Sequence, residues 1–324
     1  MTSIEHGTVL GGGERGGSAP QSGLQSVQEV TDAVHEMYRH HPFPPLQRKH
    51  SYRGHARYVR SFLEERRFDP AGKAFGDIAC GTGLIMLDYA QEFQDSKVTG
   101  FDLSEASVAR ANQTLDEEGV TNARAQVQDI MALDLENAFD FILSWGTVHH
   151  LGDSRRGFGN LIRALRPGGY MRLGVYGYYG NWERRIQQEI VRAVTAPGSL
   201  SLDDRIEVVR EWAKGDRNFK NYYTAPPVDL GDDDWVVDEF LHVWERWLEF
   251  REVVSWCLDE RLEVCQLTDY YDHEISLDIE RHSTSPEFVE RVRSLPFVEQ
   301  CHVVDLIARP YWLSLFVHKP ADRG

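Results

Sequence analysis

Short apolar runs alternate with longer amphipathic segments along the middle of this chain. The runs have the length and composition of buried strands, and they occupy residues 73–79, 96–102, 123–129, 139–145 and 170–177. Segments with helical spacing lie between them, over residues 83–93, 104–119 and 154–169. Because each crossover helix must cover a face of the sheet, this order predicts an α/β fold with a Rossmann-like, doubly wound, mostly parallel sheet over residues 71–176.

The pattern changes after the fifth run. Residues 177–260 are interpreted as a helical insert, because the alternation stops there and most of the tryptophans follow. Residues 261–324 are expected to complete the sheet, with "YWLSLFVHKP" as an antiparallel terminal strand. Its preferred partner is "CHVVDLI", residues 301–307, and "LEVCQLTD", residues 262–269, competes for the same place.

Two further segments precede the alternating region. Residues 1–25 contain "GGGERGG" and "SAPQSG", which cannot bury apolar surface, so we predict a disordered tail. Residues 26–70 hold one helical segment that stops at Pro42 and a second over residues 54–68. We expect these two helices to form an N-terminal cap.

Composition narrows the function classes. The 324 residues include 51 acidic and 35 basic side chains, for a formal net charge of −16, which disfavours binding to nucleic acid. No apolar run is long enough to cross a bilayer, and the start lacks the layout of a signal peptide, so we expect no membrane association and a cytoplasmic protein. The four cysteines have no metal-like spacing and are expected to be reduced thiols, with no bound metal.

A glycine-rich turn follows the first predicted strand, in the sequence Asp77-Ile78-Ala79-Cys80-Gly81-Thr82-Gly83. In an open α/β sheet, ligands bind beyond the carboxyl ends of the strands. A dinucleotide fingerprint would need a third glycine where Met86 stands, which disfavours a nicotinamide-dependent dehydrogenase. Asp102 ends the second strand, where a carboxylate can accept from two ribose hydroxyls, and Asp129 ends the third strand, within reach of an exocyclic adenine amine.

The ordered series of these motifs, with "FDFILSWGTVHHLGD" and "LIRALRPGGYMRLGVYG", resembles class I S-adenosylmethionine-dependent methyltransferases over residues 71–176. The resemblance implies S-adenosyl-L-methionine as cofactor, with Asp102 on the ribose and Asp129 on the adenine. It also implies further cofactor contacts. Residues of the glycine turn would hold the methionine part, and these are Asp77, Ala79, Cys80, Gly81, Thr82 and Gly83. Leu103 and Ile130 would flank the adenine ring, and the backbone at Ser144 and Trp145 would line the methionine end. Ala79 departs from the family, which usually has its first glycine there.

Catalytic candidates follow the fourth strand. His149 and His150 lie where the methyl group would point, and histidine titrates in the range of a general base. Neighbouring residues should not both face the pocket, and we prefer His149 as base or anchor. The alternative is that the pair braces the loop.

Two residues of the predicted cap are further candidates for the cofactor. Arg53 could pair with a carboxylate of cofactor or substrate, or it could belong to a solvated helix face. Tyr38 could close over the cofactor or anchor the cap to the sheet.

Acceptor specificity is expected in the insert. Aromatic side chains give flat apolar contact with a polar tip, which suits a partly aromatic or apolar metabolite. The candidates are Tyr176, Tyr178, Tyr179, Trp182, Tyr222 and Tyr223. Trp244 and Trp247, at helical spacing, are interpreted as core.

The sequence therefore predicts methyl transfer to an oxygen or nitrogen of a small molecule. Two alternatives stay open. One is transfer of an aminopropyl or carboxymethyl group, and the other is a non-catalytic scaffold with the same fold. A homodimer is also left open.

Overall fold

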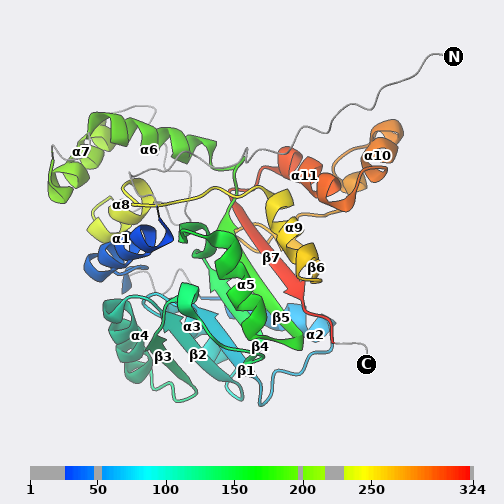
Figure 1. Ribbon diagram of the computed structural model, residues 1–324, viewed down its shortest axis with the longest axis horizontal. Coiled ribbons are helices and arrows are strands. Elements are labelled where there is room, and N and C mark those ends of the chain that lie inside the picture. The colour runs from blue at the N-terminus through cyan, green and yellow to red at the C-terminus, as the bar shows by residue number, and fades with distance from the viewer. Residues whose placement is uncertain (1–25, 47–52, 196–199, 216–229, 322–324) are drawn as a thin grey trace.

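A computed structural model describes residues 26–46, 53–195, 200–215 and 230–321. The predicted tail, residues 1–25, lies outside the described residues. A sheet of seven strands runs through the molecule in the order β3-β2-β1-β4-β5-β7-β6 (Figure 1). The strands are β1 Ala74–Ile78, β2 Lys97–Asp102, β3 Ala123–Val127, β4 Phe139–Trp145, β5 Leu165–Tyr176, β6 Glu263–Thr268 and β7 Trp312–His318. The predicted Rossmann-like α/β fold is confirmed.

The antiparallel ending of the sheet settles the open choice of partner. Strands β1 to β5 pair in parallel, and β7 pairs antiparallel with both β5 and β6. The preferred partner, residues 301–307, was a wrong prediction, because it lies in helix α11, Phe297–Ala308. The buried residues of that helix are Cys301, Val304 and Asp305, a spacing of three and four that belongs to one helical face.

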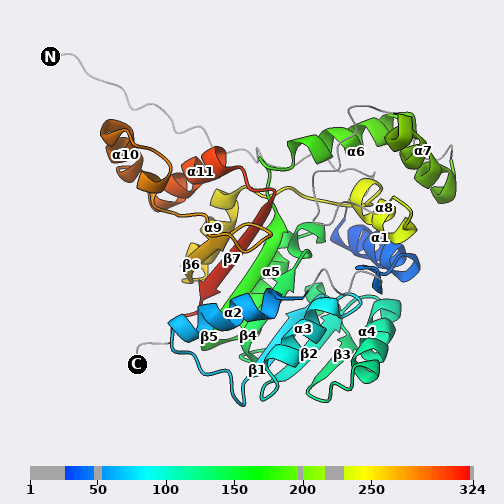
Figure 2. The same cartoon turned by 180° about the vertical axis from the view of Figure 1, so that it is seen from behind.

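Helices cover both faces of the sheet. Helices α5 (Ser154–Ala164) and α9 (Phe250–Asp259) lie on one face, and α2 (His55–Glu65), α3 (Leu84–Glu92) and α4 (Glu105–Glu117) on the other (Figures 1 and 2). Side chains of β7 alternate between the two cores, as a period of two requires: Leu315 packs with the first group and Phe316 with the second.

Local signals set the ends of these helices. The Ser104 hydroxyl accepts from the Ser107 N–H and caps α4, and Gly119 follows that helix with φ of +69°. Helix α5 ends at Ala164, five residues before the expected end, because β5 begins at Leu165 beside Phe139 of β4. The chain turns through Gly168, with φ of +82°, inside that strand.

A separate helical layer stands beyond the carboxyl ends of the parallel strands. It consists of α1 (Val27–His40), α6 (Trp182–Val194), α7 (Leu202–Gly215) and α8 (Asp233–Phe240) (Figure 1). These helices share a core around Met37, Val191, Val209 and Trp235. The two helices of the predicted cap are thus separated, since α1 joins this layer while α2 packs on the sheet.

The rest of the predicted insert divides in a similar way. Its last helix, α9, packs on the sheet, and residues 241–249 before it contain no helix. Trp247 is buried there as expected, but Trp244 is half-buried and donates its indole N–H to the Leu151 carbonyl oxygen at 3.2 Å. Beyond β6, the 3₁₀ helix η4 (Ile279–Arg281) and α10 (Pro286–Arg293) lead into α11.

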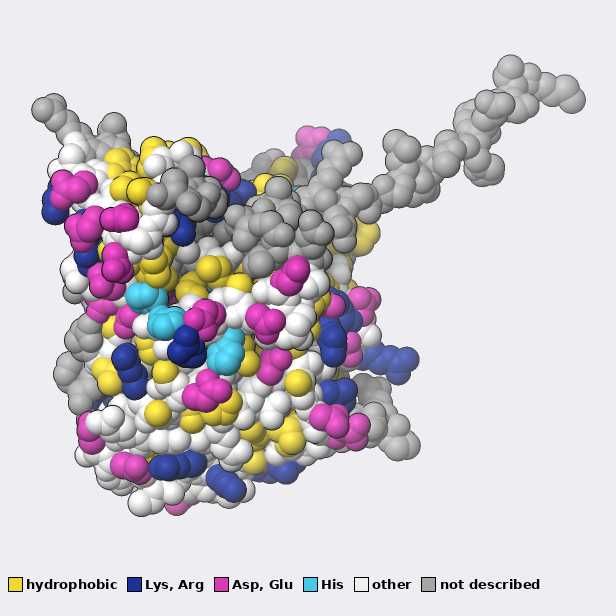
Figure 3. Space-filling model, turned by 60° about the vertical axis from the view of Figure 1, so that its left-hand side comes forward, with side chains coloured by type: hydrophobic (Ala, Val, Ile, Leu, Met, Phe, Trp, Pro, Cys, Tyr) yellow, Lys and Arg dark blue, Asp and Glu magenta, His cyan; other side chains and the backbone are white. Residues whose placement is uncertain are grey.

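The surface is mixed in charge. Figure 3 shows acidic and basic side chains next to one another on one face, with hydrophobic atoms between them. Within the described ranges, none of the helices combines the length and the apolar character that a membrane span requires. All four cysteines are free thiols, and three of them are buried.

Candidate active site

A cavity lies between the carboxyl ends of the parallel strands and the helical layer. Asp77, Asp102, Trp145 and Tyr176 line it from β1, β2, β4 and β5. Tyr38 of α1, Arg184 of α6 and residues of α8 close it from the other side. The fold therefore brings the predicted ligand-binding edge of the sheet against three helices that are distant from one another in sequence.

The glycine turn adopts a backbone that favours glycine. Ala79, Gly81 and Gly83 have φ of +66°, +53° and +79°. A Cβ on Gly81 would lie 2.3 Å from the carbonyl oxygen of Phe43, which also accepts from the Thr82 N–H at 3.1 Å. The "HHPFPP" segment therefore crosses directly over the turn, and glycine at 81 is required by the chain's own backbone.

Asp102 is half-buried, and both of its carboxylate oxygens are anchored. Its Oδ2 accepts from the Gly81 N–H at 2.8 Å and its Oδ1 from the Ser104 N–H at 2.9 Å. Burial raises the pKa of this carboxyl above its usual value. Each oxygen keeps a second lone pair, so the residue can still accept from the two hydroxyls of a ribose.

Asp77, whose carboxyl group lies near that of Asp102, has one buried oxygen atom that is unsatisfied. Its side chain is 4% exposed, it lines the cavity, and its Oδ2 has no hydrogen-bond partner among the described residues. Burial, and then the charge of Asp102, raise the pKa of Asp77 to about 8. A buried acceptor of this kind suits a cationic group on the ligand.

Asp129 combines two roles. Its Oδ1 accepts from the Met131 N–H at 2.7 Å and caps the 3₁₀ helix η2, Ile130–Ala132, while the residue also lines the cavity. Leu103 and Ile130 line the same part as apolar walls. This arrangement fits a flat heterocycle such as adenine.

The histidine pair occupies the 3₁₀ helix η3, Val148–His150. His149 is fully buried between the rings of His150 and Tyr176, each 4.1 Å away between centroids, and does not line the cavity. His150 lines it, and its Nδ1 lies 3.1 Å from the Trp244 carbonyl oxygen, so Nδ1 carries the proton and Nε2 is an acceptor. Burial lowers the pKa of His150 to about 3, which keeps the ring neutral.

Three buried carboxyl groups surround Arg184, where the helical layer closes the cavity. The Arg184 guanidinium donates to Glu245 Oε1 at 2.9 Å and lies 3.4 Å from Glu239 Oε1. Asp238 Oδ1 accepts from the Tyr38 hydroxyl at 2.9 Å. Burial raises the pKa to about 6 for Asp238 and to about 7 for Glu239 and Glu245.

One comparison with known proteins concerns the part of the chain that carries the glycine turn and the strand-end aspartates. A family model described as "Methyltransferase domain" matches residues 76–169, which contain the glycine turn, Asp102 and Asp129. This match identifies residues 76–169 as a methyltransferase domain, the family that the ordered motifs resemble. Its cofactor is S-adenosylmethionine, and the anchored Asp102 and the unpartnered Asp77 oxygen fit that molecule's ribose and amino group.

Relatives match parts of the chain. An uncharacterized protein of Synechococcus sp. is 30% identical over 192 residues, which are 56% of this chain and 46% of that protein. Phosphoethanolamine N-methyltransferase 2 of Caenorhabditis elegans is 32% identical over 107 residues, 33% of this chain and 24% of that protein. The chain thus spans less than half the length of these curated relatives.

A solved structure shows the same fold. PKMT2 from Rickettsia typhi, in complex with AdoHcy, has a TM-score of 0.61 and 17% identity, and the match covers 87% of this chain and 56% of that one.

The structure places the predicted site residues in two groups. Those lining the cavity are Tyr38, Asp77, Ala79, Cys80, Gly81, Asp102, Leu103, Asp129, Ile130, Trp145, His150 and Tyr176. Those outside its lining are Arg53, Thr82, Gly83, Ser144, His149, Tyr178, Tyr179 and Trp182. Tyr222 and Tyr223 lie outside the described residues.

Packing explains three of the residues outside the lining. Arg53 is exposed, as expected of a solvated position, and Trp182 is 53% exposed at the start of α6. Ser144 is fully buried within β4, on the strand's other side from the adjacent Trp145.

Arg184, Asp238, Glu239, His242 and Glu245 were not predicted from the sequence. One signal for them exists, since "WVVDEF" places two acidic residues inside an apolar run, where the whole segment is buried. Charged side chains at such positions need partners from elsewhere in the fold. Those partners come from α1 and α6, so no local pattern identifies them.

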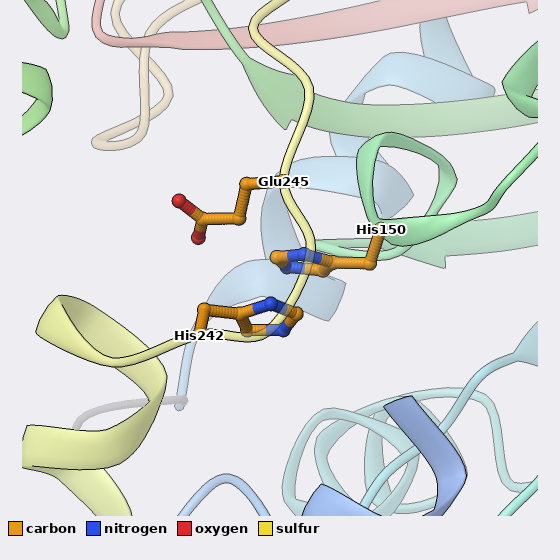
Figure 4. A group of neighbouring side chains, drawn as sticks. All are labelled: His150, His242 and Glu245. Atoms are coloured by element: carbon orange, nitrogen blue, oxygen red, sulfur yellow. The ribbon is translucent and has the colours of Figure 1, made fainter. Parts of the chain in front are cut away.

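His150, His242 and Glu245 lie close enough together to suggest a metal centre. Figure 4 shows the two imidazole rings face to face, and their centroids are 4.0 Å apart with 16° between the planes. His242 Nδ1 accepts from the Trp244 N–H at 3.1 Å, and Glu245 accepts from Arg184 and Gln188 at 2.9 Å each. Stacked rings aim their lone pairs in parallel rather than at one point, and the guanidinium repels a cation, so these residues fit a hydrogen-bond network better than a metal.

We expect the Asp77 carboxyl to make cofactor binding depend on pH. Its raised pKa means that it is protonated below about pH 8, whereas an ammonium group pairs with the ionised form. Binding then releases a proton, so we expect the affinity for S-adenosylhomocysteine to rise between pH 6 and pH 8, by up to about tenfold per unit. Calorimetry across this range measures the slope. Asp77→Asn is expected to bind more weakly with a shallower slope, and an unchanged slope would contradict the assignment.

Proposed function

We propose that the protein transfers the methyl group of S-adenosylmethionine to an oxygen or nitrogen atom of a small-molecule acceptor. The observation that carries this proposal is a single cavity with two different ends. One end, at β1 and β2, holds the anchored Asp102 and the unpartnered Asp77, and the other, at β5 and β7, is lined by the aromatic side chains of Tyr176 and Trp312.

Different residues would contact different parts of the cofactor and of the acceptor. When bound, S-adenosylmethionine supplies a methyl group on a positively charged sulfur. Asp102 would hold its ribose, Asp129 its adenine and Asp77 its amino group, while the aromatic walls exclude water from the acceptor. Alignment of two reactants in this way can lower a barrier by about 7–11 kcal/mol. His150, neutral with Nε2 as acceptor, is the histidine placed to orient an acceptor hydroxyl or amine.

The proposal is tested first by ligand binding and then by product mass. A ligand at 100 times its dissociation constant stabilises the folded state by about 2.7 kcal/mol. S-adenosylmethionine and S-adenosylhomocysteine are each expected to raise the melting temperature by several degrees, and NAD is expected to leave it unchanged. A metabolite extract incubated with methyl-labelled cofactor should then yield a labelled small molecule. A product that gains an aminopropyl or carboxymethyl group would contradict methyl transfer, and a flat response to both adenosyl ligands would contradict the cofactor site.

A further inference from the structure

The acceptor side of the cavity, which is the part between Tyr176 and helix α8, has more acidic than basic side chains. Asp238 and Glu239 of α8 line it and are 5% and 3% exposed, and Glu245 lies directly behind them. Arg184 is the one lysine or arginine among the described residues of the lining. His150 and His242 add no positive charge, because burial lowers the pKa of both rings.

The single guanidinium is already engaged. Arg184 donates to Glu245 Oε1 at 2.9 Å, to the carbonyl oxygen of Asp238 at 3.2 Å and to that of Glu239 at 3.3 Å. Its plane also lies over the Tyr176 ring, 4.3 Å from the centroid. Arg184 thus gives its hydrogen bonds to Glu245 and two backbone groups, and its single positive charge, 3.4 Å from Glu239 Oε1, is shared among three carboxyl groups.

The Glu239 carboxylate is incompletely hydrogen-bonded. Its Oε1 is buried without a hydrogen-bond partner among the described residues, and its nearest cationic atom is Arg184 Nε at 3.4 Å. A buried carboxylate oxygen in this position costs free energy unless a ligand supplies a donor. Because the residue lines the cavity, that donor can come from the acceptor molecule.

The remaining walls suit a cation. Aromatic rings attract positive charge over their faces, and the acceptor side is rich in them: Tyr176, Trp235, Tyr270, Tyr311 and Trp312. A neutral acceptor could supply a hydrogen-bond donor but no opposite charge, and an anionic acceptor would add repulsion to these carboxyl groups.

We propose that the acceptor is a small-molecule amine whose ammonium group is bound by Glu239 and Asp238. If this nitrogen is the one methylated, one of the two carboxylates would take the proton that it must lose before its lone pair can form the N–C bond, and the C–S bond would break to release S-adenosylhomocysteine. This inference rests on the proposed methyl transfer, since it names the class of acceptor for the same cavity. Its test is a binding measurement made with S-adenosylhomocysteine already present, so a missing cofactor site and a wrong acceptor class give different results.

The experiment uses three matched sets of compounds. Each set has an amine, the corresponding alcohol and the corresponding carboxylate: phenethylamine, 2-phenylethanol and phenylacetate; tyramine, tyrosol and 4-hydroxyphenylacetate; tryptamine, tryptophol and indole-3-acetate. Calorimetric titration into the full-length protein saturated with S-adenosylhomocysteine is expected to show amines binding at least about tenfold more tightly than both counterparts in one or more sets. Equal binding of an alcohol or carboxylate, or no amine binding below millimolar concentration in any set, would overturn the proposal.

Variants connect the selectivity to the carboxyl groups. Glu239→Gln is expected to weaken amine binding by about tenfold or more while alcohol binding stays within about twofold. Asp233→Asn, on the exposed side of the same helix and ion-paired with Arg210, is the matched control and should change neither. If Glu239→Gln does not fold, Asp238→Asn gives the same comparison. Amine selectivity that persists unchanged in a folded Glu239→Gln or Asp238→Asn protein would contradict the assignment.

Discussion

Asp102→Ala is expected to lower the affinity for S-adenosylhomocysteine by at least about 100-fold. The variant removes a carboxylate that is placed to accept from two ribose hydroxyls, and hydrogen bonds to a charged group are each worth about 1.5–3 kcal/mol. It also leaves the N–H groups of Gly81 and Ser104, which donate to Asp102 at 2.8 and 2.9 Å, without an acceptor. Calorimetry of the purified variant measures the loss.

A matched control separates this effect from a general change of charge. Asp116 lies on α4, is 69% exposed and pairs with Arg124 at 3.1 Å, so Asp116→Ala should leave the affinity within about twofold. Asp102→Asn keeps the shape of the side chain and removes its charge, together with one of the two acceptors that Gly81 and Ser104 use. Wild-type affinity in a folded Asp102→Ala protein would mean that the cofactor binds elsewhere.

Arg184→Met is expected to destabilise the protein by about 3–5 kcal/mol at pH 8. Removing one partner of a buried charge cluster leaves the others uncompensated, and Arg184 is the guanidinium that faces Glu239 and Glu245. Urea unfolding followed by circular dichroism measures the change. Arg192→Met, on the same helix but paired with an exposed Glu189, should change the free energy of unfolding by less than about 0.5 kcal/mol.

The loss caused by Arg184→Met should depend on pH in a defined direction. The pKa values of Asp238, Glu239 and Glu245 are already raised by burial, and Arg184 opposes that rise. Without it they rise further, so the folded state binds protons more tightly than the unfolded chain. Stability is then lost as the pH increases from about 4 through the folded-state values. We expect a smaller deficit at pH 5.5 than at pH 8, and a constant deficit would show that the lost hydrogen bonds, rather than charge, dominate.

The parallel part of the fold could be predicted because its signals are local. Ser104 caps α4 through a neighbouring N–H, and the apolar runs that became β1 to β5 are each buried within one sheet. The choice between residues 262–269 and 301–307 failed because both are short and apolar. The burial of Val304 and Asp305 on one helical face, which decides it, depends on packing against α9.

Only the part of the site that would hold the cofactor could be predicted from the sequence. Asp77, Asp102 and Asp129 follow strands whose carboxyl ends meet at one edge, so a linear motif locates them. The preference for His149 over His150 could not be decided in this way, because which ring faces the cavity depends on Tyr176 and on the Trp244 carbonyl oxygen, both distant in sequence.

The sequence by itself determined the parallel part of the sheet, its crossover helices and the carboxylates at its carboxyl edge, because each depends on periodicity or on a spacing within one strand–turn–helix unit. Only the tertiary structure decided what lies opposite. It brings Tyr38, Arg184 and Glu239 together from three helices, and contacts between such distant segments leave no periodic trace in the chain. The acidic character of the acceptor side is therefore a property of the packed helices, and it belongs to no single stretch of sequence.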